Sequence, residues 1–394
     1  MKKQTLIMIL GLAGFTVWAD NWVVSPILPA IADDLGQEVT RAGLLITAYM
    51  LPFGLFQLVF GPLADRYGKR QVLAGTMLFF TAATALCAVA SGFTDLTVYR
   101  ALTGVFAASV MPVSMALIGD MVPLPERQAA IGTFLGIAFL GQGLSMAIGG
   151  TIAYFLSWRS VFGIYSVLAA VSTTLLFYGG RHYPTAKNPG SSFLGPYGRL
   201  LKNPASLRLY LIVLLQGILI IGSFSYLGAY ISKTYQYNYL YIGLIMTAFG
   251  IAAMIGARMS GKLGRSLPQK NLVVSGFTIA SAANVVLYFL GHRLEFLILG
   301  VTLLGFGLML AYSTILTIAT EFAAQARGAA MSLAAFCFMG GGGIGTAIGG
   351  KVIDAIGFDL FYLYYGLGLI ALAALAAFWV TAPKVSKTSI EAVG

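Results

Sequence analysis

Residues 61–70 read Gly61-Pro62-Leu63-Ala64-Asp65-Arg66-Tyr67-Gly68-Lys69-Arg70 and separate two apolar runs, 42–64 and 71–92. Each run exceeds roughly 20 residues, the length that an α-helix needs to cross the hydrocarbon core of a bilayer. Glycine lets the chain turn tightly and lets two helices approach closely, and the charged groups are best placed at the membrane edge. The stretch therefore predicts a hairpin of two membrane-spanning helices.

The composition extends this prediction to the whole chain. Of the 394 residues, 58% are hydrophobic and only 9% are charged. A soluble domain carries roughly 25% charged residues, because they cover its surface. We therefore expect an integral membrane protein in contact with a lipid bilayer.

Runs of spanning length occur twelve times, and each must be a helix because backbone polar groups in lipid have to be paired within the segment. They cover 5–31, 42–64, 71–92, 96–119, 129–156, 159–179, 207–231, 240–263, 271–291, 295–319, 328–354 and 358–381. The predicted fold class is an all-α membrane protein of two six-helix bundles, 1–180 and 207–394, joined by a linker at 181–206.

The basic residues predict the orientation, since cytoplasmic loops are rich in Lys and Arg. With a cytoplasmic N-terminus, 18 of the 24 basic residues fall on the cytoplasmic side, 5 fall outside, and Arg100 falls within a span. Both termini are then cytoplasmic. The net charge of +11 is spread between apolar runs rather than clustered, so we expect no nucleic-acid partner.

The linker contains four prolines and several basic residues. Within it, 197–202 fits either a short amphipathic helix on the membrane surface or a solvated connection. The sequence leaves both open.

The halves resemble each other. Residues 147–150 and 347–350 both read Ala-Ile-Gly-Gly, 200 residues apart, and Gly68-Lys69 corresponds to Gly264-Arg265. Duplication of six spans is typical of secondary transporters, with a substrate site near the midplane between the repeats.

The 61–70 stretch resembles a signature of the major facilitator superfamily. The resemblance implies a conformational latch in which Asp65 caps the cytoplasmic end of span 11 and pairs with basic groups. Its residues would be Gly61, Asp65, Arg66, Gly68 and Arg70, with Asp120 as a second acidic partner. The second-half copy has Gly261 in place of the aspartate, and a turn that merely sets topology is the simpler alternative.

Span 4 contains Arg100 in a segment, 96–108, that also resembles a motif of this family, with Thr103 at a usual glutamine position. Span 1 contains Asp20, the only carboxylate in the interior of any span. Burial disfavours a charged carboxylate and a nearby arginine favours it, so the two effects compete. We predict that Asp20 and Arg100 couple transport to protons. The alternatives are a permanent structural pair, or an Arg100 side chain that extends to the interface.

Pro26-Ile27-Leu28-Pro29 and 158–162 resemble elements of twelve-span drug/proton antiporters. The antiporter motif of span 5 is only partly present, because Ser145-Met146 replaces its Gly-Pro pair. The predicted hinge or packing residues are Gly141, Ser145, Gly149 and Gly150.

A pocket with one acid and many aromatic residues suits a small amphipathic, even cationic, organic substrate. The candidate contacts are Asn21, Trp22, Tyr49, Gln142, Gln216, Tyr226, Asn284 and Tyr312. The predicted function is drug-efflux-like export driven by a proton gradient, and a symporter or facilitator for a metabolite or lipid is the alternative. We expect a monomer without cofactor or metal. An enzyme is disfavoured, because no histidine lies in a span and no second embedded acid accompanies Asp20.

Overall fold

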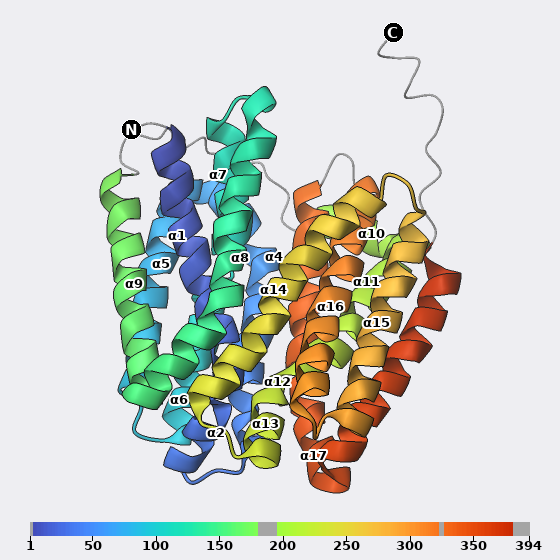
Figure 1. The fold of residues 1–394 in the computed structure, drawn as a ribbon. Coiled ribbons are helices and arrows are strands. Elements are labelled where there is room, and N and C mark those ends of the chain that lie inside the picture. The colour runs from blue at the N-terminus through green and yellow to red at the C-terminus, as the bar shows by residue number, and fades with distance from the viewer. Residues whose placement is uncertain (1–2, 180–194, 323–326, 381–394) are drawn as a thin grey trace.

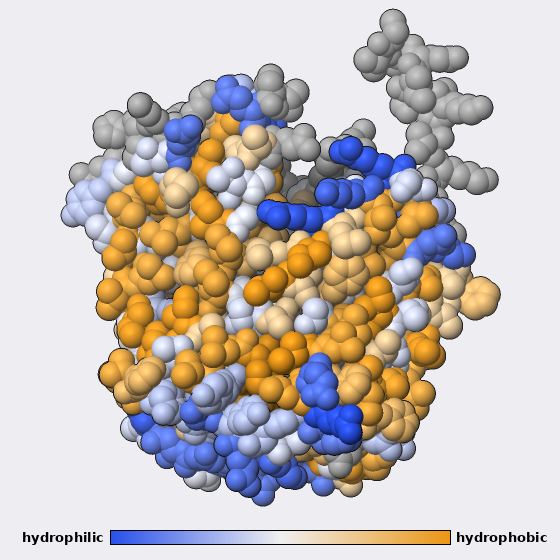
Figure 2. Space-filling view, viewed as in Figure 1, coloured by the Kyte–Doolittle hydropathy of each residue, from blue (hydrophilic) through white to orange (hydrophobic). Residues whose placement is uncertain are grey.

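The computed structural model describes residues 3–179, 195–322 and 327–380, and these form twelve helical membrane spans, as predicted. Figure 2 shows a broad hydrophobic band across the visible face of the molecule, with hydrophilic residues above and below it. This pattern matches a bundle whose sides face lipid. The protein is a multi-pass membrane protein.

The first six spans are formed by nine helices: α1 (Lys3–Trp22), α2 (Val24–Asp34), α3 (Val39–Ala42), α4 (Leu44–Tyr67), α5 (Lys69–Ala88), α6 (Phe93–Ala107), α7 (Val110–Met121), α8 (Leu124–Phe155) and α9 (Trp158–Gly179). A short helix, α10 (Gly195–Lys202), precedes the second half. The second six spans are formed by α11 (Pro204–Gln216), the π-helix η2 (Gly217–Ile221), α12 (Gly222–Ser225), α13 (Leu227–Tyr235), α14 (Tyr239–Leu263), α15 (Gln269–Leu290), α16 (Leu294–Phe322) and α17 (Arg327–Trp379).

Several spans that the sequence predicts as continuous are broken. Span 1 divides at Val23, and Pro26 and Pro29 follow in α2, where neither can donate a backbone hydrogen bond. Span 7 contains the π-helix and divides again at Tyr226. Spans 11 and 12 both lie within α17, and the helix is kinked between them at Gly357. The φ of Gly357 is 78°, a value that only glycine adopts readily.

We call the end of the bundle where α1 begins and α9 ends the linker end, and the opposite end, with the α2–α3 turn, the distal end. Across the distal half of the bundle, α2 packs on α13, α4 on α17, and α8 on α14. These contacts between the two halves are called the seam. Toward the linker end the halves diverge, and Figure 2 shows a notch between them there. The structure is therefore closed at the distal end and open at the linker end.

Glycines allow the close backbone approach within the seam. A side chain on Gly243 of α14 would collide with the carbonyl oxygen of Met146 in α8, and one on Gly150 would collide with that of Tyr239. Such small-residue contacts are typical of helix pairs in membranes. They fix α8 against α14 over the distal half only.

The linker helix packs on protein. The Tyr197 hydroxyl donates to the carbonyl oxygen of Leu58 in α4, at 3.2 Å, and Leu200 is buried beside α11 and α17. Of the two alternatives left open for 197–202, a short helix forms, with Tyr197 and Leu200 packed on the bundle. Residues 180–194 lie outside the described residues.

Candidate functional site

Asp20 and Arg100 form a buried ion pair. The Arg100 Nη1 donates to Asp20 Oδ2 at 2.7 Å, and the two side chains are 0% and 1% exposed. Asp20 lies near the end of α1 and Arg100 in the middle of α6, so the fold brings together residues 80 positions apart. The alternative in which Arg100 extends to the membrane interface is wrong, because its guanidinium points inward.

Aromatic rings enclose the pair within the first half. The Arg100 guanidinium lies 4.4 Å from the ring centroid of Tyr49 in α4 and 5.5 Å from that of Phe162 in α9. Such cation–π contacts stabilise a cation removed from water. Tyr49 was predicted as a substrate contact, but it is fully buried against this pair instead. The reason is that its ring covers the arginine and its hydroxyl donates to the Val17 carbonyl.

One polar atom on each partner of the ion pair has no hydrogen bond. Asp20 Oδ1 and Arg100 Nε are buried and have no hydrogen-bond partner among the described residues. A single hydrogen bond joins the two side chains, whereas a bidentate pair would have two. Fewer contacts therefore have to break when the partners separate.

Among the residues that the structure describes, the contacts of the predicted latch residues lie within the first half. Lys69 bridges two carboxylates, with its Nζ 2.6 Å from Asp120 and 3.5 Å from Asp65. Arg70 donates to the Phe177 carbonyl in α9, and Arg66 lies over the neighbouring Tyr67 ring. These placements fit the opening at the linker end, which separates the motif from the second half. Residues 323–326, at the start of span 11, lie outside the described residues.

Lys69 is a central member of this cluster that the prediction omitted; it begins α5 directly after the turn at Gly68, close to Asp65 at the end of α4. Gly68 takes a φ of 105° at the turn, so glycine is required there. Gly61 is different: a side chain built there would meet open space. The close helix approach expected at Gly61 is therefore absent in this conformation.

The second half has a neutral counterpart of the Lys69 bridge. Gln269, at the start of α15, donates to Glu321 at the end of α16, at 3.0 Å. The pair corresponds in position to Lys69 and Asp120, about 200 residues earlier. The contact joins the same two helix ends as the Lys69–Asp120 pair, although in the sequence repeat the counterpart of Lys69 is Arg265.

The predicted hinge residues of span 5 all lie in α8, which is continuous from Leu124 to Phe155. Gly141 packs against the Phe15 backbone of α1 and Gly149 against Val23, whereas Gly150 faces the second half. Ser145 donates to Gln142 one turn earlier. In this conformation they act in close packing, without a break in the helix.

Hydrogen bonds cross the seam from side chains to backbone carbonyls. Ser25 Oγ lies 3.1 Å and 2.9 Å from the carbonyl oxygens of Phe224 and Ser225, and Thr47 donates to that of Gly343 at 2.9 Å. Tyr226 lies within hydrogen-bond distance of the Thr40 and Thr346 carbonyls. Tyr226, predicted as a substrate contact, therefore holds the distal end closed. Ser25 and Thr47 were missed, because no sequence pattern marks a hydroxyl that bonds to backbone.

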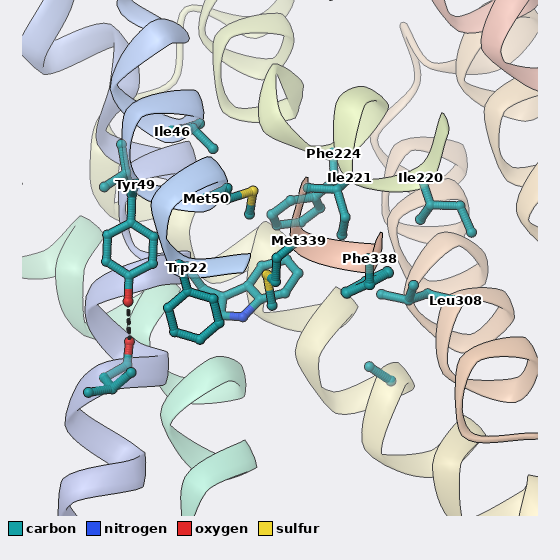
Figure 3. Close-up of a cluster of buried hydrophobic side chains, with 14 of the residues drawn as sticks. Trp22, Ile46, Tyr49, Met50, Ile220, Ile221, Phe224, Leu308, Phe338 and Met339 are labelled. Carbon is teal, nitrogen blue, oxygen red and sulfur yellow. Dashed lines mark hydrogen bonds between the residues drawn. The ribbon is translucent and has the colours of Figure 1, made fainter. Parts of the chain in front are cut away.

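A cluster of buried hydrophobic side chains, with Trp22, Phe224 and Phe338 among them, lies between the two halves (Figure 3). Trp22 packs edge-on against Phe224 at 5.3 Å and lies 5.6 Å from Phe249, between centroids. Tyr312 stacks on Phe338 at 4.3 Å in the second half. The structure thus places Trp22 at the junction of the halves, as expected for a substrate contact.

The remaining candidates separate by location. Asn21 and Gln142 are buried on α1 and α8 of the first half. Gln216 donates to the Leu308 carbonyl and Asn284 to that of Ala280, so both bond within the second half. Asn284 lies in α15, which packs mainly on α16 and α17, and its predicted role as a substrate contact finds no support in this placement. Within the described residues no group of His, Cys, Asp and Glu could hold a metal ion.

Comparisons with known proteins give a consistent result. The model of the Major Facilitator Superfamily matches residues 10–346 and 229–393. An uncharacterised MFS-type transporter of Bacillus subtilis, YceJ, is 27% identical over 85% of this chain and 86% of its own. The multidrug transporter protein MdtP of the same organism is 25% identical over 90% of this chain and 76% of its own.

The fold is also similar to a solved structure. A bacterial homolog of the human lysosomal transporter Spinster, in an inward-facing and occupied conformation, superposes with a TM-score of 0.77 at 17% identity. The match covers 96% of this chain and 97% of that one.

Proposed function

This chain belongs to the major facilitator superfamily, and we propose that it is a proton-coupled exporter of small amphipathic organic compounds that works by alternating access. As a member of that family it is a membrane transporter and not an enzyme. The proposal adds the substrate class, the driving ion and the direction.

The buried Asp20–Arg100 pair is the observation that carries the proposal. A carboxylate inside a membrane bundle is costly unless it is paired or protonated. With Arg100 2.7 Å away, Asp20 is paired in this conformation. A rearrangement that withdraws Arg100 leaves the carboxylate to be neutralised by a proton, and the return of Arg100 releases that proton. Proton uptake and release are then tied to the conformational cycle.

The asymmetric closure of the bundle supports alternating access. The seam closes the distal end and the halves diverge at the linker end, so a central site is reached from one side only. In the proposed orientation both termini and the linker end are cytoplasmic, and the driving force is the proton gradient, with no cofactor. The protein would act as a monomer in a cell membrane. The MdtP relative, a multidrug transporter by name, supports the substrate class.

The test is transport in proteoliposomes with an imposed pH gradient and an entrapped pH dye. We expect Asp20→Asn to abolish gradient-driven transport and substrate-induced proton movement, because the amide cannot exchange a proton. Asp34→Asn is the matched control, since Asp34 lies at the exposed distal end of the same span. Unchanged gradient-driven transport by Asp20→Asn would contradict the proposal. Gradients imposed in both directions separate an exporter from an uptake symporter or a facilitator.

A further inference from the structure

Two tryptophan side chains on one face of α1 have buried polar atoms without partners. The indole Nε1 atoms of Trp18 and Trp22 make no hydrogen bond among the described residues, and neither does the neighbouring Asn21 Oδ1. Trp22 is 3% exposed and Asn21 6%. An unpaired buried donor carries a desolvation penalty, so each such group in a folded protein calls for an explanation.

Trp22 lies where the two halves meet, and Trp18 lies beside it on α1. Trp22 packs on Phe224 and Phe249 of the second half, and Trp18 stacks on Trp22 at 6.4 Å, one turn closer to the linker end. Trp18 is half-buried and touches Phe139 of α8. Figure 3 shows the nitrogen of Trp22 on the side away from Tyr49 and towards the second half. The Trp22 donor therefore faces the inter-half space, and Trp18 stacks beside it.

The groups around Trp18 and Trp22 favour a ligand with a hydrogen-bond acceptor over a cationic ligand. An indole N–H can only donate, and a carboxamide has no net charge. The nearest carboxylate, Asp20, is neutralised by Arg100 and held behind Tyr49 within the first half. The residues around Trp18 and Trp22 therefore present two unpaired indole donors, one unpaired acceptor on Asn21 and no uncompensated negative charge.

We propose that Trp18 and Trp22 form a substrate-binding site for an uncharged amphipathic aromatic molecule that carries an exposed oxygen acceptor, such as a carbonyl or phosphoryl group. The indole N–H groups donate to that oxygen, and the rings of Phe139, Phe224 and Phe249 pack against the apolar part of the molecule. This inference rests on the proposed transport function and narrows its substrate class. It differs from the cationic substrate that the sequence alone allows.

The test compares two aryl phosphorus compounds, one triphenyl and one tetraphenyl, on the purified full-length protein. Triphenylphosphine oxide is uncharged and has a strong oxygen acceptor, whereas tetraphenylphosphonium is a cation without one. By calorimetric titration we expect the wild type to bind the oxide more tightly. Trp22→Phe keeps the aromatic ring and removes the donor, so it weakens oxide binding about fivefold to tenfold, the equivalent of one net hydrogen bond. Binding of tetraphenylphosphonium to this variant stays unchanged.

Trp158→Phe is the matched control, because the Trp158 indole donates to Asp34 at the distal end. Equal oxide binding by wild type and the Trp18→Phe/Trp22→Phe double variant would overturn the inference. So would absence of oxide binding by the wild type, or tighter phosphonium binding that Asp20→Asn removes. Tryptophan-dependent oxide binding without proton movement in proteoliposomes would contradict the proposed proton coupling and leave this site intact.

Discussion

The seam hydrogen bonds predict that Ser25→Ala shifts the protein towards a conformation open at the distal end. Ser25 is 3% exposed, and its hydroxyl has two acceptors in the second half, the carbonyls of Phe224 and Ser225. One hydroxyl hydrogen serves one acceptor at a time, so the variant loses a single net hydrogen bond of about 1 kcal/mol. Because only the distal-closed state contains this bond, the ratio of closed to open molecules falls about fivefold.

The assay is a distance distribution between spin labels at the distal ends of the two halves, on Glu38→Cys and Arg293→Cys, both exposed positions. We expect the long-distance population to rise in Ser25→Ala. A further rise is expected when Tyr226→Phe is added, because its hydroxyl bond to the Thr40 carbonyl also crosses the seam. Ser172→Ala is the control, since Ser172 is equally buried but bonds to Leu168 of its own helix. Identical distributions in wild type, Ser25→Ala and the double variant would refute the reasoning.

Two further predictions concern charged pairs of the first half. Arg100→Leu leaves Asp20 buried without its partner, so we expect a loss of about 3–5 kcal/mol in stability; thermal unfolding in detergent measures it, and the Arg100→Leu/Asp20→Asn double variant should recover much of the loss. A single variant as stable as the wild type would contradict this. The hydrogen bond from Arg159 lowers the pKa of Asp34 below its ordinary value of 3.8. The stabilisation is therefore fully present above that value and is lost as the pH falls through the lowered pKa. The melting-temperature difference between wild type and Asp34→Asn should shrink on acidification below about pH 3.8, and a difference that grows in acid would contradict the assignment.

Much of the architecture follows from the sequence because the bilayer restricts the choices so strongly. Runs of spanning length must be helices, and all twelve predicted spans are present. The Asp20–Arg100 contact was foreseeable for the same reason: a lone carboxylate and a lone arginine in apolar runs each need a partner. The enclosure of the pair by Tyr49 and Phe162 was not foreseeable, because aromatic residues are frequent throughout the chain.

The conformation is the part that the sequence could not supply. It depends on small residues and hydroxyls, such as Gly150, Gly243, Ser25 and Thr47, whose types occur in every span. The latch motif was recognisable at once, yet its partners depend on whether the linker end is open or shut. The break in span 7 at Tyr226 could not be predicted from the sequence either, since that position is neither proline nor glycine.

The seam has a consequence for how this transporter can change over time. Its acceptors are the main-chain oxygens of Phe224, Ser225, Gly343 and Thr40, and a point substitution alters a side chain without removing the carbonyl beneath it. Closure at the distal end therefore tolerates mutation on the acceptor side of each bond. Trp18 and Trp22 donate none of these hydrogen bonds, so a change at either position leaves the acceptors of the seam in place. Substrate specificity can therefore change during evolution while the hydrogen bonds that close the distal end are kept.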